Sequence, residues 1–145
     1  MNQFDTRIER VWWILRIGLG LAPFLAGLDK FFNLLADWPS YMSPLALRIL
    51  PFSASTFMHI IGVIEMIVGL AILTKWTRLG SYVAAVWLAL IALELLTTGA
   101  HFDVAVRDVL IALSAYSLAL LTEVRAQSAQ RVPSAAAPLS LSRTA

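Results

Sequence analysis

The 145-residue sequence contains no cysteine, only two histidines and few charged residues. The absence of cysteine excludes disulfides, thiol redox chemistry and thiolate metal sites. Charged residues make up 14% of the chain, whereas an ordinary soluble domain carries about 25%. The chain is therefore too poor in charge for a typical soluble domain, and any redox role would depend on a bound cofactor.

Long apolar runs fill most of the sequence, which is 59% hydrophobic. Four runs hold 17 or 18 residues each, at 11–28, 57–73, 79–96 and 104–121. A helix rises about 1.5 Å per residue, so roughly 20 residues cross the hydrocarbon of a membrane. The helices of a soluble bundle would each carry a polar stripe, whereas the segment 84–96 of the third run has no polar residue until Glu94. We predict an all-α integral membrane four-helix bundle, with residues 1–125 as the transmembrane domain.

Basic residues predict the orientation of these spans. If the spans alternate in direction, one side of the membrane receives seven Lys and Arg residues and the other receives three. Cytoplasmic loops are enriched in basic residues, so the larger set marks the cytoplasmic side and places both termini there. The net charge of +2 includes no basic patch, so no nucleic-acid partner is expected.

Two segments outside the spans carry their own signals. Ser43 followed by Pro44, with Pro51 beyond, predicts a helix of about two turns in the first outer loop. Its aromatic and aliphatic surroundings suit an interfacial helix in the headgroup zone, and a loop packed over the mouth of the bundle fits equally well. Residues 126–145 are rich in Gln, Ser, Ala and Pro and lack aromatics, which predicts a cytoplasmic tail that is disordered unless a partner holds it.

Charged residues in the first two spans share helix faces with glycines. These faces comprise Arg16, Gly20, Pro23, Gly27 and Lys30 in the first span, and Gly62, Glu65, Met66 and Gly69 in the second. Small residues let membrane helices approach closely, so we expect the two faces to meet. An unpaired charge in hydrocarbon costs roughly 2.5 to 3.5 kcal/mol, so we predict an ion pair between Arg16 and Glu65. Structural neutralisation and a functional polar site are both open interpretations of that pair.

A second polar set lies toward the outer ends of the spans. It consists of Asp29, Lys30, His59, Glu94, His101, Asp103, Arg107 and Asp108. Glu94 and Arg107 fall at matching depth, so we expect them to pair. No metal-binding spacing occurs, and no metal is expected. A quinone head group is one candidate ligand, because its carbonyls accept hydrogen bonds from basic side chains. The alternative is a network that satisfies helix ends and holds the outer loop.

Several motifs resemble those of the DoxX-like family. They are Leu15-Arg16-Ile17-Gly18-Leu19-Gly20, Ala26-Gly27-Leu28-Asp29-Lys30-Phe31, the run from Gly62 through Glu65 to Leu70, Thr77-Arg78-Leu79-Gly80, and Arg107-Asp108. The resemblance covers about residues 11–122. It implies a four-helix module of the bacterial cytoplasmic (inner) membrane, similar to the small membrane subunit of a thiosulfate:quinone oxidoreductase. Some members of the family carry cysteines. This chain has none, which excludes a thiol-based mechanism.

Together these observations favour a non-catalytic subunit that anchors or stabilises a quinone-linked redox complex. A quinone-binding oxidoreductase subunit and a small transporter or proton channel that uses Glu65 are the alternatives. No catalytic residue is assigned, and quinone and bound lipid are the candidate ligands. The expected partners are the bilayer and either other membrane subunits or further copies of the chain. The intramembrane polar or ligand-binding candidates are Arg16, Lys30, His59, Glu65, Glu94, Arg107 and Asp108.

Overall fold

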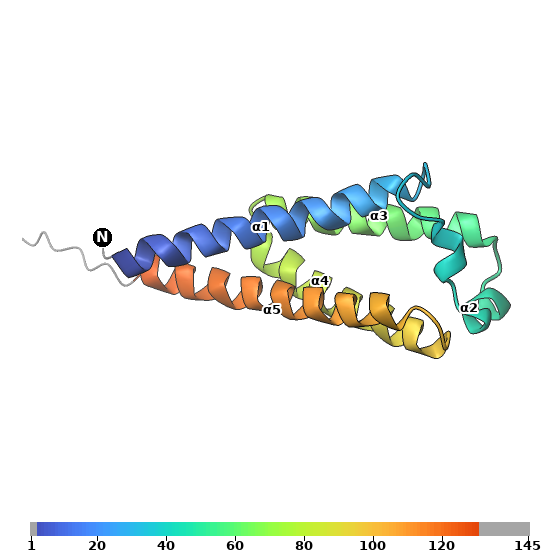
Figure 1. Cartoon of the computed structure of the whole chain (residues 1–145). Helices are drawn as coiled ribbons and strands as arrows, with labels where there is room; N and C mark the ends of the chain where they lie inside the picture. Colours follow the sequence, from blue (N-terminus) through green and yellow to red (C-terminus); the bar gives the residue numbers. More distant parts are fainter. Residues whose placement is uncertain (1–2, 131–145) are drawn as a thin grey trace, which may run out of the picture.

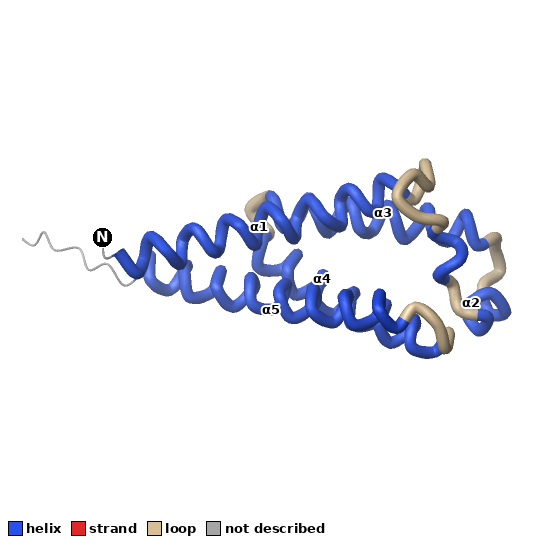
Figure 2. The backbone as a smooth tube through the Cα atoms, viewed as in Figure 1, coloured by secondary structure: helices blue, strands red, loops and turns tan. Residues whose placement is uncertain are grey.

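The computed structural model describes residues 3–130 as helices joined by short connections (Figure 1). The elements are α1 (Gln3–Asp29), a 3-10 turn η1 (Trp38–Tyr41), α2 (Pro44–Ile49), α3 (Ala54–Leu73), α4 (Thr77–Thr97) and α5 (Phe102–Gln130). Figure 2 shows helix throughout the described part of the chain, with loops only between helices and no strand. The predicted all-α fold is confirmed.

Four of these helices are long and apolar enough to cross a membrane. The qualifying segments are 6–29, 54–73, 77–97 and 102–129, and each contains one of the predicted spans. Large aliphatic side chains cover their outward faces, with Ile14 70% exposed and Leu93 61% exposed. A surface of this kind is solvated by lipid, where helices satisfy their own backbone hydrogen bonds. The chain is a multi-pass membrane protein in a bilayer environment.

The local signals at the helix ends account for most of the observed boundaries. Ser53 Oγ accepts a hydrogen bond from the backbone N–H of Thr56 and caps α3. The short helix α2 begins at Pro44, directly after Ser43, as the sequence predicts. By contrast, α5 continues to Gln130, five residues beyond the predicted end of the transmembrane domain at residue 125. Extending a formed helix through alanine and glutamine costs little. Residues 131–145 of the predicted tail lie outside the described residues.

The four long helices form two antiparallel pairs, α1 with α3 and α4 with α5. Figure 1 shows the pairs converging where α1 begins and α5 ends, and diverging toward the other end of the molecule. The start of α1 is joined to α5 by a hydrogen bond from Trp12 Nε1 to Thr122 Oγ1, 2.8 Å long. α2 lies at the opposite end of the molecule. We call the two ends the converging end and the α2 end.

Two buried apolar clusters stabilise the bundle at different depths. The cluster nearer the converging end contains Trp12, Val68, Ile72, Ala84, Ala115 and Leu118. The cluster nearer the α2 end contains Ala92, Leu95 and Ala105. Along α5, the buried Asp108 lies between Ala105 and Ala115. Charge is therefore buried at a depth between the two apolar clusters.

Candidate functional site

Four glycines bring the backbones of α1 and α3 into direct contact. A methyl group added at Gly62 would lie 2.5 Å from the carbonyl oxygen of Gly27, and one added at Gly69 would lie 2.5 Å from that of Gly20. Both distances are well inside van der Waals contact, so only glycine fits at these crossing points. The prediction that these two helix faces meet is confirmed.

The same glycines place a lysine and a glutamate beside each other. Lys30 follows Gly27 by three residues and Glu65 follows Gly62 by three, so each charged residue shares a face with its glycine. A methyl group at Gly27 would lie 3.0 Å from Glu65 Cβ, and one at Gly62 would lie 3.2 Å from Lys30 Cβ. Each charged residue thus lies against the glycine of the opposite helix. Lys30 Nζ lies 2.6 Å from Glu65 Oε2, and these side chains are 5% and 11% exposed.

The predicted ion pair between Arg16 and Glu65 is wrong. Arg16 Nε donates instead to the carbonyl oxygen of Ile72 at 3.1 Å. A terminal guanidinium nitrogen donates to the carbonyl oxygens of Leu73 and Thr74 at 2.7 and 2.6 Å. The last carbonyls of a helix lack partners within the helix, and a basic side chain satisfies them. Arg16 therefore caps the carboxyl end of α3.

The loop after α1 covers the lysine of this pair. Lys30 Nζ lies 3.8 Å from the centre of the Trp38 ring, a cation–π contact. Trp38 is positioned by Asp29, whose Oδ2 accepts a hydrogen bond from the indole N–H at 2.8 Å. The Asp29 carboxylate also accepts the backbone N–H groups of Leu34 and Leu35 at 3.0 Å. Trp38 was not among the predicted site residues, and its place depends on this loop structure rather than on a sequence motif.

A third ionisable side chain from α5 completes the buried group. Asp108 is 6% exposed and interacts electrostatically with both Lys30 and Glu65. Its carboxylate also accepts a hydrogen bond from Arg107 Nε at 3.3 Å, and the Arg107 side chain is 61% exposed. We call Lys30, Glu65, Asp108 and Arg107 the charged cluster. In their ordinary charge states these four side chains sum to zero, which reduces the cost of burial.

The predicted pairing of Glu94 with Arg107 is also wrong. Glu94 Oε1 accepts the backbone N–H of Ser43 at 3.0 Å and thereby holds the start of α2 against α4. Arg107 turns to its neighbour Asp108. Glu94 contacts the backbone of Ser43, and Arg107 contacts the adjacent carboxylate, so matching depth on adjacent helices did not decide the partners.

The two histidines lie apart from one another and make ring contacts. The His59 ring stacks on Phe31 with the centroids 4.8 Å apart and the planes 3° from parallel. The His101 ring lies 4.7 Å from that of Tyr41. Over residues 3–130, no group of three or more His, Cys, Asp or Glu side chains could hold a metal ion. His59 contacts the loop after α1 through its stacking on Phe31.

The chemistry available to the charged cluster is limited to polar contact and proton exchange. Lys30 and Arg107 are donors suited to a carbonyl or a phosphate, and Glu65 and Asp108 are acceptors. Two hollows on the described surface lie elsewhere, one along the end of α3 and one between α4 and α5, and none of their lining residues belongs to the cluster. Comparison of the chain with family models, curated proteins and solved structures finds no match. Membership of the DoxX-like family stays a prediction.

Proposed function

We propose that the chain is a non-catalytic membrane subunit that anchors or stabilises a quinone-linked redox complex of the bacterial cytoplasmic membrane. The main support for this proposal is that charged side chains within the spans form ion pairs with one another or hydrogen bonds to the ends of helices. Lys30 pairs with Glu65, and Arg16 caps α3. Such contacts lock helices together, which is the requirement for a scaffold.

The outer surface supports the same proposal. A subunit that holds other membrane proteins must present apolar helix faces toward them, and packing in lipid depends on close contact of such faces. On α1, Ile14, Leu21 and Leu25 are 70%, 42% and 52% exposed, and Gly18 has open space around it. This face is free for lipid or for a neighbouring helix.

Cross-linking in native membranes tests the proposal. Because the chain has no cysteine, Gly18→Cys introduces a single reactive site on the exposed face of α1. We expect cross-links to redox subunits, which mass spectrometry would identify. The matched control is Leu113→Cys on the outward face of α5, where Leu113 is 58% exposed. Cross-links only to lipid or to further copies of the chain would contradict the proposal.

Single cysteines also test the predicted topology. Ser128→Cys near the end of α5 and Leu34→Cys in the loop after α1 are at opposite ends of the bundle. If both termini are cytoplasmic, a membrane-impermeant thiol reagent added outside the cell labels position 34 and leaves position 128 unlabelled. Labelling at position 128 alone would reverse the proposed orientation.

A quinone-binding subunit is the second candidate, favoured by one buried donor. Trp87 Nε1 is buried without a hydrogen-bond partner in the described part of the chain. Gly80 of α4 packs against Ile72 of α3. Seven residues from this contact toward the α2 end, α4 carries Trp87 and α3 carries Glu65. Trp87 therefore lies at about the depth of the charged cluster. An unsatisfied N–H costs about 1–3 kcal/mol, which a quinone carbonyl would relieve.

Extraction of the purified protein separates the two candidates. If quinone binds at this depth, it co-purifies with the wild type. The amount of bound quinone should be smaller in Trp87→Phe, which removes the N–H and keeps an aromatic ring. Trp76→Phe is the matched control, because Trp76 lies in the α3–α4 turn and is 57% exposed. Absence of quinone from the wild type, with no competition by quinone analogues, would exclude the second candidate.

A further inference from the structure

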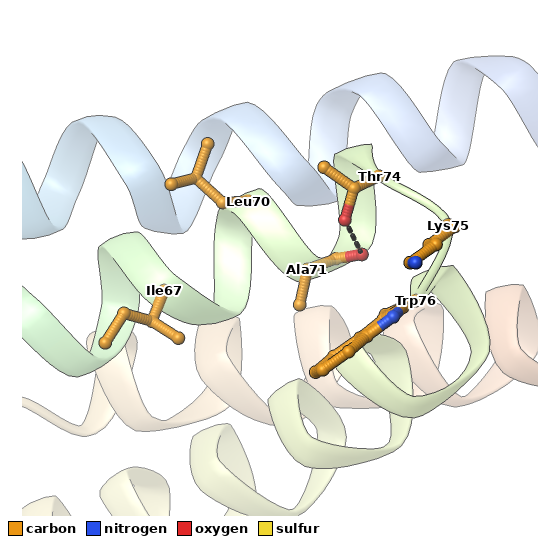
Figure 3. Close-up of a pocket in the computed structure, with 6 residues that line it drawn as sticks. All are labelled: Ile67, Leu70, Ala71, Thr74, Lys75 and Trp76. Carbon is orange, nitrogen blue, oxygen red and sulfur yellow. Dashed lines mark hydrogen bonds between the residues drawn. The ribbon is translucent and has the colours of Figure 1, made fainter.

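A shallow hollow lies on the lipid-facing surface where α3 ends, away from the charged cluster. Its volume is about 570 Å³, and it is lined by Ile67, Leu70, Ala71, Thr74, Lys75 and Trp76. Figure 3 shows the side chains of Ile67 and Leu70 along α3 and the Trp76 ring beyond Ala71. We call this hollow the α3 groove. Its existence is independent of the proposed redox function.

The walls of the groove are apolar. Ala71 forms its floor, because a single methyl group between longer neighbours leaves a depression in the helix surface. Ile67 is 60% exposed and Trp76 57% exposed, so both present their side chains outward as walls. The hydroxyl of Thr74 donates to the carbonyl oxygen of Ala71 at 3.2 Å and is not offered to a ligand. The surface suits a hydrocarbon chain.

An unpaired positive charge lies at one end of the groove. Lys75 lines the groove, is exposed, and forms no hydrogen bond or ion pair with any described residue. The α3 carbonyls that a lysine at this position would otherwise cap are already occupied by Arg16. The ammonium group of Lys75 is thus available to a ligand.

Other charges nearby do not neutralise Lys75. Glu123 accepts a hydrogen bond from the hydroxyl of Tyr82 at 3.0 Å and lies 4.0 Å from Arg78 Nε. Glu9 is engaged by Arg125 through two hydrogen bonds of 2.6 and 2.8 Å. Glu123 and Glu9 therefore already have basic or hydroxyl partners, and neither neutralises Lys75.

The depth of the groove matches the border of the hydrocarbon. α3 has 20 residues and spans about 30 Å, the thickness of a bilayer core. The α3–α4 turn that contains Lys75 and Trp76 is therefore at headgroup level, where tryptophan is enriched. A ligand lying in the groove has its apolar part in the acyl region and a negative group at the interface.

We propose that the α3 groove binds an anionic phospholipid of the leaflet that borders the α3–α4 turn. One acyl chain lies along Ile67, Leu70 and Ala71, and the phosphate contacts the Lys75 ammonium group. A helix from a partner subunit would cover the apolar wall but leave Lys75 without a counter-charge, whereas a phospholipid supplies both groups at the required depth.

Native mass spectrometry of the full chain in detergent tests this proposal. The protein is titrated with phosphatidylglycerol, with phosphatidylcholine of the same acyl chains, and with free glycerol phosphate. A basic residue near an anionic surface contributes about 1 kcal/mol, so we expect the first phosphatidylglycerol to bind about fivefold more tightly than phosphatidylcholine. Lys75→Gln should abolish this preference. Arg10→Gln, which removes another exposed cation from α1, should retain it.

A second variant tests the apolar part of the site. Ala71→Leu fills the floor of the groove and should weaken binding of both lipids with no change in unfolding temperature. Ala89→Leu makes the same substitution at an exposed position of α4 and should leave binding unchanged. The proposal is overturned if Lys75→Gln retains the preference, if Ala71→Leu binds as the wild type does, or if glycerol phosphate binds as tightly as the lipid. A cross-link from Ile67→Cys to a polypeptide in native membranes would also overturn it.

Discussion

The two helix pairs of this protein are packed by different means. Where α1 meets α3, glycines allow the two backbones to touch, as at Gly27 and Gly62. Where α4 meets α5, alanines are buried instead, with Ala92 and Ala105 both 2% exposed. The first pair carries the buried ion pair between its helices, whereas among the described residues no ion pair is buried between α4 and α5.

The contrast between glycine and alanine packing accounts for where the charges are buried. In lipid, helices associate through close packing and polar contacts rather than through the hydrophobic effect. Backbone contact at the glycines shortens the distance that Lys30 and Glu65 must bridge, and the pair forms at 2.6 Å. On the alanine-packed pair, the buried Asp108 takes its nearest cation from its own helix. The buried ion pair between helices thus occurs in the pair that packs through glycines, α1 with α3.

The largest effect should come from breaking the glycine contact itself. Gly27→Leu places a side chain against the backbone of α3, which cannot move aside, so we expect about 3 kcal/mol of destabilisation, the upper end of the usual cost of overpacking, or loss of the folded state. Gly18→Leu makes the same change on α1 where no atom lies within 4 Å, and it should be nearly neutral. Unfolding in mixed micelles measures both. Equal effects at the two positions would contradict the comparison.

Removing one member of the buried ion pair should have the next largest effect. Lys30→Met leaves Glu65 without its partner, and breaking a buried pair costs about 3–5 kcal/mol. The double variant Lys30→Met/Glu65→Leu removes both charges and should regain most of that loss. A double-mutant cycle on unfolding free energies measures the coupling. If the two single effects simply add, the pair is not the structural lock between α1 and α3.

The cap at the other end of α3 should contribute less. Arg16→Met removes three hydrogen bonds to the last carbonyls of α3, and we expect about 2 kcal/mol of destabilisation, the usual contribution of hydrogen bonds to a charged group. Arg16 is only partly buried, so water replaces some of these bonds. Hydrogen exchange should become faster in the α3–α4 turn and stay unchanged at the Gly27–Gly62 contact. Faster exchange at that contact would mean that the cap and the glycine contact unfold together.

The smallest effect should come from the exposed link between α1 and α5. Glu9 and Arg125 are 41% and 45% exposed, and exposed ion pairs contribute about 0–1 kcal/mol. Glu9→Gln should therefore change stability by less than about 0.5 kcal/mol, and added salt should remove even that difference. A loss comparable to that of Lys30→Met would show that the converging end, rather than the glycine contact, determines the stability of the bundle.

Much of the architecture was predictable from local sequence. The four spans follow from run length, the α2 helix from Ser43 and Pro44, and the contact between α1 and α3 from glycines at matching helical spacing. These features depend on one segment at a time, or on two segments that share a periodic pattern. Periodicity is visible in a sequence because it reflects the geometry of the helix itself.

The partners of the charged residues were not predictable in the same way. Depth estimated from the ends of the apolar runs placed Arg16 near Glu65, but in the structure Arg16 is level with Ile72, seven residues or about 10 Å further along α3. Pairing Gly27 with Gly62 and Gly20 with Gly69 would have supplied the correct register and brought Lys30 to Glu65. No comparable signal in the sequence places Trp38 over Lys30 or brings Asp108 near the pair.

It follows from the order of the amino acids alone that this chain is helical, that four helices suit a membrane, and which faces carry glycine and charge. These properties depend on composition and helical period, which are local. The packing of the helices in three dimensions sets which charges pair, which loop covers them, and where an apolar groove meets a lysine that has no partner among the described residues. Those outcomes depend on the register between helices far apart in the chain, because a shift of one turn changes the neighbours of every side chain at the interface.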